Sequence, residues 1–175
     1  MGTDSLRIPV NLLVGVTVLR LEHLKLTDAT QDLSQVQELI CQGSHITQIH
    51  NDVWNALPAL RTALLQKNKL RSFPTECLEH CSKIIYLNLD HNKISTIPTI
   101  HTTSLLTLSL AYNQLTCIPS SLLQPTSLIK LTLDYNAITI IPSEVSNWKS
   151  MERLSLLHTR YPLPLISTYL LAHTY

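Results

Sequence analysis

Residues 84–98 read IIYLNLDHNKISTIP, and the same arrangement returns as LLTLSLAYNQLTCIP at 105–119 and as LIKLTLDYNAITIIP at 128–142. Each stretch has apolar residues at its first, fourth, sixth, eleventh and fourteenth places, an asparagine at its ninth place and a proline at its fifteenth. A pattern that recurs at a short period predicts a solenoid, in which each unit packs only against its neighbours.

The pattern extends in both directions from these three stretches, with more exceptions. Upstream, Leu60, Leu65 and Asn68 fit the template, whereas Ser44 replaces the asparagine one unit earlier and Thr159 replaces it in the last unit. We count seven repeats, which begin near residues 16, 36, 60, 84, 105, 128 and 151. Residues 1–175 are therefore expected to form a single domain, with residues 1–15 as an N-terminal cap, 16–160 as repeats and 161–175 as a C-terminal cap.

Each conserved place within the unit has a physical reason. Apolar residues at the fourth and sixth places flank an outward residue, which is the alternation of a strand with one buried face. An asparagine where the chain leaves the strand can bond the backbone of its own turn and of the adjacent unit. We therefore expect a ladder of structural asparagines formed by Asn68, Asn92, Asn113 and Asn136.

These motifs resemble the leucine-rich repeat family over residues 16–160. The resemblance implies an α/β solenoid, a right-handed superhelix of about seven repeats. It places a parallel β-sheet on the concave face, and short helices or 3-10 turns on the convex face.

Composition and motifs give no support to an enzyme or a cofactor protein. The chain has a net charge of +1 and three glycines, so neither a nucleic-acid or membrane partner nor a phosphate-binding loop is indicated. The eight histidines are scattered, and the spacing of Cys77 and Cys81 is a poor match to zinc sites. We therefore expect no catalytic residue, no cofactor and no metal.

The four cysteines do not cluster at the chain ends, where extracellular members of the family carry disulfide-bonded caps. Cysteines scattered in this way favour a reducing compartment, and hence the cytoplasm. The uneven repeat lengths and the IP-x-x-L unit at residues 118–122 also resemble leucine-rich effectors of intracellular bacterial pathogens. That resemblance implies delivery into the cytosol of a host cell.

The second, third, fifth, seventh and eighth places of each repeat are expected to point away from the core and to form the concave face. Tyrosine, histidine and charged residues gather there over the last strands, and tyrosine and arginine are enriched at interface hot spots. The alternative is that tyrosine is merely tolerated on an exposed β-surface. The predicted partner-binding residues are Tyr86, Asn88, Asp90, His91, Tyr112, Lys130, Asp134, Tyr135, Arg153 and His158.

The sequence thus predicts a non-enzymatic module, monomeric when free, that binds one folded protein through its concave face. By analogy with the ribonuclease inhibitor, the partner is expected to be an enzyme that the module inhibits, regulates or recruits. Two alternatives stay open at this stage. One is a fragment of an extracellular-type recognition receptor, and the other is a structural scaffold that acts by self-association.

Overall fold

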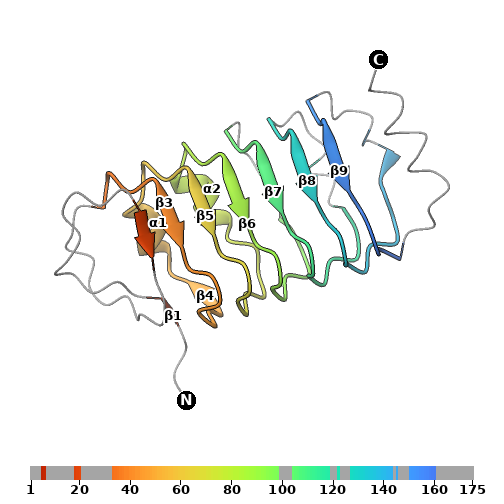
Figure 1. Cartoon of the computed structure of the whole chain (residues 1–175), viewed down its shortest axis with the longest axis horizontal. Coiled ribbons are helices and arrows are strands. Elements are labelled where there is room, and N and C mark those ends of the chain that lie inside the picture. The colour runs from red at the N-terminus through yellow and green to blue at the C-terminus, as the bar shows by residue number, and fades with distance from the viewer. Residues whose placement is uncertain are drawn as a thin grey trace.

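The computed structural model describes residues 5–6, 18–20, 33–98, 104–118, 122, 127–143, 145 and 150–160, with side chains from residue 33 onward. A seven-stranded parallel sheet runs through this part of the chain, and its strands lie side by side in sequence order (Figure 1). The strands are β2 (Val18–Arg20), β3 (Glu38–Ile40), β5 (Thr62–Leu64), β6 (Tyr86–Asn88), β7 (Thr107–Ser109), β8 (Lys130–Thr132) and β9 (Arg153–Ser155). The predicted leucine-rich repeat solenoid is confirmed.

The register of the sheet is constant from strand to strand. The residue at the third place of each repeat pairs with the third place of the next, as in Tyr86 with Thr107 and Lys130 with Arg153. The strands keep this register although the coils differ in length. Equivalent residues lie 24 apart between Gln42 and Gln66 but 21 apart between Asp90 and Ala111. Length differences are therefore absorbed outside the strands.

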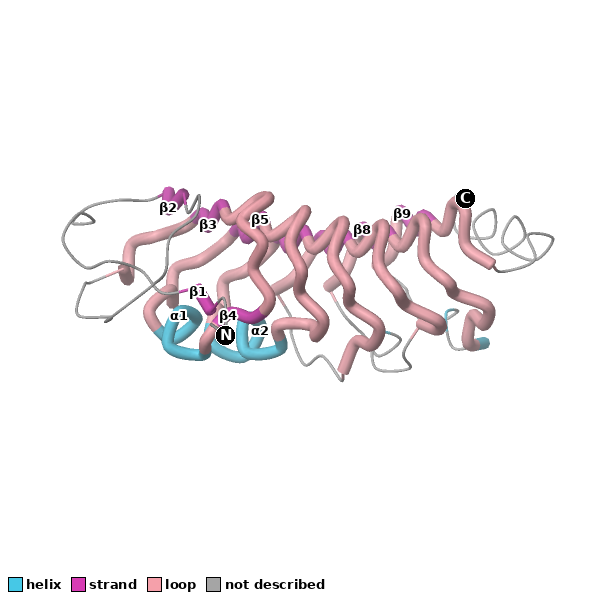
Figure 2. Tube along the Cα trace, turned by 90° about the horizontal axis from the view of Figure 1, so that it is seen from below, coloured by secondary structure: helices cyan, strands magenta, loops and turns pink. Residues whose placement is uncertain are grey.

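Two short helices cover the side of the solenoid opposite the sheet, α1 (Asn51–Asn55) and α2 (Thr75–His80) (Figure 2). Each buries residues toward the core, including Trp54, which is completely enclosed. A further two-stranded parallel pair, β1 (Ser5–Leu6) with β4 (Gln48–Ile49), also lies on this side. The remainder of the predicted N-terminal cap and all of the predicted cap at 161–175 lie outside the described residues.

The core is a column of apolar side chains stacked coil upon coil. Leu39, Ala63, Leu87, Leu108 and Leu131 occupy the fourth place of successive repeats, and each is fully buried. No single coil can enclose such a side chain by itself, since its upper and lower surfaces are covered by the adjacent coils. Burial is thus shared between repeats, and the core is continuous from Leu33 to Leu156.

The four asparagines of the expected ladder are buried and join adjacent coils. In Asn92, the side-chain Nδ2 donates to the carbonyl oxygens of Leu89 in its own coil and Leu65 in the preceding coil, both at 3.0 Å. Its Oδ1 accepts from the backbone N–H of Leu70 in the preceding coil, also at 3.0 Å. Asn68, Asn113 and Asn136 repeat this pattern. An amide is needed here because both a donor and an acceptor are used.

Candidate functional site

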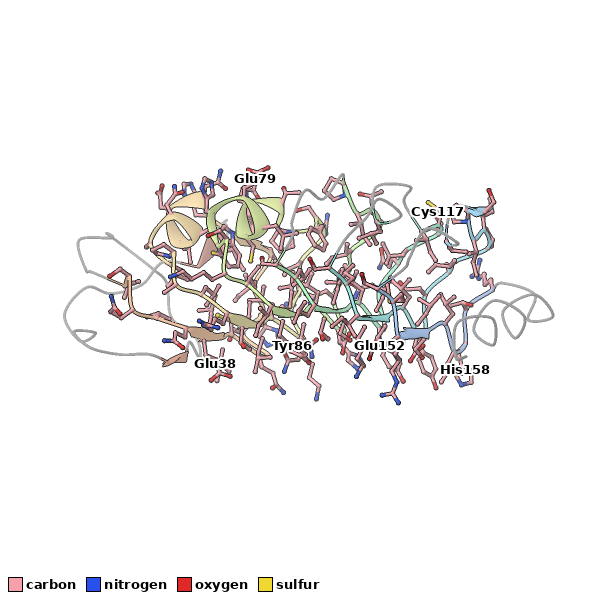
Figure 3. The ribbon with its side chains drawn as sticks, turned by 90° about the horizontal axis from the view of Figure 1, so that it is seen from above. Glu38, Glu79, Tyr86, Cys117, Glu152 and His158 are labelled. Carbon is pink, nitrogen blue, oxygen red and sulfur yellow. The ribbon has the colours of Figure 1, made fainter. Side chains whose placement is uncertain are left out.

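The face of the sheet opposite the helices, here called the open face, carries the predicted binding residues. Tyr86 and His158 lie on this side of the ribbon, together with Glu38 and Glu152, whereas Glu79 lies on the other side (Figure 3). All ten predicted residues lie on β6, β8 and β9 or in the turns that follow β6, β7, β8 and β9.

The third place of each repeat forms a row across the strands. Parallel pairing places Tyr86 beside Thr107, Thr107 beside Lys130 and Lys130 beside Arg153. Tyr86 and Lys130 are half-buried and Arg153 is exposed. Neighbouring strands are ~4.8 Å apart, so this row can contact one partner surface.

The eighth place has a left-handed backbone in every described repeat. The torsion φ is positive at Gly43, Lys67, His91, Tyr112, Tyr135 and His158. This conformation places the Cβ atom of an ordinary residue close to the following carbonyl oxygen, and glycine avoids that strain. Only one of the described repeats uses glycine at this place, so the other repeats accept a cost of about 1–2 kcal/mol each to carry a side chain there.

Four of these eighth-place rings form a continuous stack. The ring centroids are separated by 4.1 Å from His91 to Tyr112, by 4.2 Å from Tyr112 to Tyr135 and by 4.4 Å from Tyr135 to His158. The first two pairs are almost parallel, with interplanar angles of 10° and 9°. We call this set the aromatic ladder. Its side chains remain exposed even though their ring faces cover one another, as shown by the 43% exposure of Tyr112.

The close stacking alters the chemistry of the central phenol. Hydrogen bonding with Tyr135 raises the pKa of Tyr112 above its usual value, and partial desolvation and the negative charge of Asp134 act in the same direction. The Tyr112 phenol therefore stays protonated to a higher pH than a free tyrosine, with its hydroxyl bonded to that of Tyr135.

Asp90 and Asp134, at the seventh place, make bonds within the solenoid. Oδ1 of Asp90 accepts from the Ser109 hydroxyl and from the backbone N–H of Ala111, both at 2.7 Å. In the same way, Oδ1 of Asp134 accepts from the backbone N–H of Leu157 at 2.8 Å. These carboxylates therefore link successive coils, a role that the sequence pattern did not reveal.

Asn88, at the fifth place of its repeat, is also engaged locally. Its Oδ1 accepts from the backbone N–H of Asp90 at 2.9 Å. The side chain thus holds the turn that presents Asp90 and His91, although its half-buried position on β6 leaves it part of the open face.

An apolar row on the open face was missed by the sequence reasoning. Ile85 and Leu106, at the second place, have exposed fractions of 37% and 36%, and Ile129 follows them in the next coil. Reading the second-place column as a set would have found it, since three consecutive repeats carry Ile or Leu there. The open face thus has an apolar row at the start of the strands and the aromatic ladder beyond their ends.

The thiols and imidazoles do not assemble into a reactive centre in the described part of the chain. No group of three or more His, Cys, Asp or Glu side chains there could hold a metal ion. Burial raises the pKa of the Cys41 thiol to about 12. Burial also raises the pKa of the Cys77 thiol well above its usual range, and a hydrogen bond with the Cys81 thiol adds to that effect. Neutral buried thiols of this kind are poor nucleophiles.

The raised pKa of Cys41 predicts a loss of stability in alkali. Below pH 9 the thiol is protonated in both the folded and the unfolded chain, and its burial is free of any ionisation cost. Between pH 9 and about 12 only the unfolded chain ionises, so this group lowers the free energy of unfolding by up to ~1.4 kcal/mol per pH unit. Urea unfolding at pH 8 to 10 should give a shallower decline for Cys41→Ala than for the parent chain. Equal slopes would show that Cys41 is not responsible.

Comparison with known proteins agrees with this geometry. A family model described as "Leucine rich repeat" matches residues 34–94 and 58–115. The chain is a leucine-rich repeat protein. A solved structure, the crystal structure of an internalin from Listeria monocytogenes, superposes with a TM-score of 0.62 at 26% identity, over 73% of this chain and 36% of the internalin.

Among characterised sequences, this leucine-rich repeat protein is similar to lumican from Bos taurus and to fibromodulin from Sus scrofa. The identities are 31% over 118 residues for lumican and 29% over 119 residues for fibromodulin, and each match spans 62% of the chain. These matches cover 33% of the lumican sequence and 79% of the fibromodulin sequence. The matched stretch thus spans about a third of lumican. Leucine-rich repeat domains mediate protein–protein interactions and are generally non-enzymatic.

No helix in the described part of the chain is both long enough and apolar enough to cross a membrane.

Proposed function

We propose that this leucine-rich repeat protein is a non-enzymatic module that binds one folded protein through its open face, the side predicted to be concave. The proposed partner is an enzyme that the module inhibits, regulates or recruits, and the free module is proposed to be monomeric. The general role of leucine-rich repeat domains in binding other proteins supports the first part of this proposal.

The observation that carries the proposal is the aromatic ladder. Tyr112 and Tyr135 occupy backbone conformations that glycine would adopt at lower cost, yet both are large and more than 40% exposed. Folding alone does not favour such residues, whereas a binding surface does, because exposed tyrosines bury a large area with little loss of side-chain entropy. The row formed by Tyr86, Lys130 and Arg153 extends the same surface onto the strands.

The dimensions of the open face favour a folded protein or a long peptide as the partner. Seven strands spaced by ~4.8 Å span roughly 30 Å, and five residues at ~3.3 Å give a width of roughly 16 Å. With the adjoining turns, this surface approaches the ~800 Å² that one partner contributes to a standard interface.

We further propose that the module acts in a reducing compartment, the cytoplasm or the cytosol of a host cell. All four cysteines are free thiols, and three of them are buried in the solenoid. Persistent free thiols are ordinary in reducing compartments, which supports this placement. The similarity to an internalin from Listeria monocytogenes supports a role as a bacterial effector.

The test is a comparison of partner capture by the parent chain and by a variant with Tyr86, Tyr112 and Tyr135 replaced by alanine. One stoichiometric protein retained from a native lysate by the parent should be lost by the variant. Titration calorimetry with that purified protein should show a loss of at least ~2 kcal/mol in binding free energy, because hot-spot tyrosines contribute on that scale.

The control removes exposed side chains of helix α2 from the opposite side, by replacing Glu79 and His80 with alanine. The control should bind normally and both variants should keep the parent fold by circular dichroism. If affinity is unchanged in the tyrosine variant, or reduced equally in the control, the binding site does not lie on the open face.

A further inference from the structure

The turns that follow the strands carry an unbalanced charge. We define the strand-exit edge as the eighth to twelfth places of the described repeats, residues 43–47, 67–71, 91–95, 112–116 and 135–139, with 158–160 in the last repeat. These segments contain no aspartate or glutamate. They contain five cationic residues, all of them exposed, namely Lys67, Lys69, Arg71, Lys93 and Arg160.

The cations of the strand-exit edge have no acidic partner within the described residues. The one ion pair found there joins His50 to Asp52, which lies outside the edge. The nearest carboxylates in the repeat, those of Asp90 and Asp134, accept hydrogen bonds from the backbone of the next coil. Within the described part of the chain, the five positive charges are therefore available to an external anion.

The cations adjoin both ends of the aromatic ladder. Backbone bonds from Lys67 N–H to Asp90 and from His91 N–H to Ala111 place Lys67 and His91 at equivalent sites of adjacent coils. A second column, at the tenth place, contains Lys69, Lys93 and Arg160, each two residues after the eighth place of its coil. The three centroid separations of the ladder add up to roughly 13 Å, which is the length of about four residues of an extended peptide.

The ladder itself favours anions over flat aromatic ligands. The faces between its four rings are already occupied, so a nucleic-acid base has few free ring surfaces on which to stack. The ring edges remain open to solvent, and the edge of an aromatic ring is the positive part of its quadrupole. At the His91 end of the ladder, ring edges and lysine ammonium groups thus attract the same kind of group, which is a carboxylate.

We infer that the strand-exit edge binds an acidic, extended segment of the protein partner, a step that rests on the proposed function and adds the chemistry of the partner. The segment crosses the two coils at the His91 end of the aromatic ladder and places its carboxylates against Lys67, Lys69 and Lys93. The rest of the partner contacts the strands of the open face.

The test uses the full chain and a fluorescein-labelled peptide of alternating glutamate and glycine as the probe. Fluorescence anisotropy should show saturable binding that weakens as salt is added. Lys69→Glu/Lys93→Glu should weaken binding at least about tenfold, since both contacts become repulsive. The control Asn55→Glu/His80→Glu/Lys83→Glu changes the net charge by the same amount at exposed positions outside the edge and outside the second to eighth places, and should stay within about twofold of the parent.

Several results would overturn the inference. No binding of the acidic peptide is one, and an equal loss in the control is another, because it would indicate attraction by net charge alone. If an oligouridine RNA binds more tightly than the peptide and loses its binding in the same variant, the ligand of the edge is a nucleic acid and not a protein segment. If the peptide fails while the tyrosine variant still loses its captured partner, only this inference falls. If neither experiment shows binding, the proposed function falls with it.

Discussion

Replacing Asn113 by alanine is expected to lower the free energy of unfolding by about 1–3 kcal/mol. The Asn113 Nδ2 donates to the carbonyl oxygens of Leu89 at 2.9 Å and Leu110 at 3.1 Å, and its Oδ1 accepts from the N–H of Ile94 at 3.0 Å. The carbonyl oxygens of Leu89 and Leu110 keep donors from Asn92 and Asn136, but the buried N–H of Ile94 loses its acceptor. A buried group left without a partner costs about 1–3 kcal/mol. Urea unfolding followed by circular dichroism measures the loss.

Two control variants separate the ladder from a general effect of substitution. Asn113→Asp keeps the size of the side chain and the acceptor oxygen but removes both donors, so it should also destabilise the fold strongly. Gln114→Ala changes the exposed neighbouring residue and should cost less than ~0.5 kcal/mol. A neutral Asn113→Ala would contradict the structural role of the ladder.

Replacing Leu108 by alanine should cost about 2–5 kcal/mol, the usual range for a large-to-small change at a fully buried site. Leu108 lies at the centre of β7, where its register partners are Leu87 and Leu131 in the coils on either side. The cavity therefore weakens two interfaces between repeats at once. Thermal and urea unfolding both report this loss.

Leu106→Ala provides a closely matched comparison, because it makes the same chemical change two residues away on the same coil. Leu106 is 36% exposed on the open face, so its removal should cost well under half as much as the loss of Leu108. Equal costs at the two positions would show that the assignment of buried and open faces is wrong. If Leu106→Ala weakens partner binding while keeping stability, the apolar row belongs to the interface.

The sheet and its asparagines could be predicted from the sequence because their constraints recur in every repeat. A strand with one buried face requires apolar residues at the fourth and sixth places, as in Leu87 and Leu89, and both are fully buried. The asparagine place is strict in the four middle repeats, since a residue such as Asn92 must both donate and accept inside the fold. Repetition makes such requirements visible without any knowledge of the partner.

The aromatic ladder could be recognised only as a column of similar residues. Its stacking depends on two quantities absent from the sequence, the left-handed backbone at His91 and Tyr112 and the close approach of neighbouring coils. Glycine at residue 43 hinted at a special conformation, but lysine, histidine and tyrosine at the equivalent places concealed it.

The hydrogen bonds that the seventh-place carboxylates make to the next coil could not be predicted from the sequence, for a different reason. Asp90 and Asp134 alternate with Ala111 and Leu157, so the column has no common chemistry to read. The carboxylates find their partner in a backbone N–H of the next coil, which every residue except proline provides. Such an acceptor can therefore appear in one repeat and be absent from the next.

The asparagine ladder also determines how this protein responds to mechanical force. Each ladder residue bridges its own coil to the one before it and reaches no further, as Asn136 does by bonding Leu133, Leu110 and Leu115. Tension applied along the long axis must therefore peel coils away one at a time from an end. The array is therefore expected to unfold in steps, one coil after another, and the central coils should unfold last.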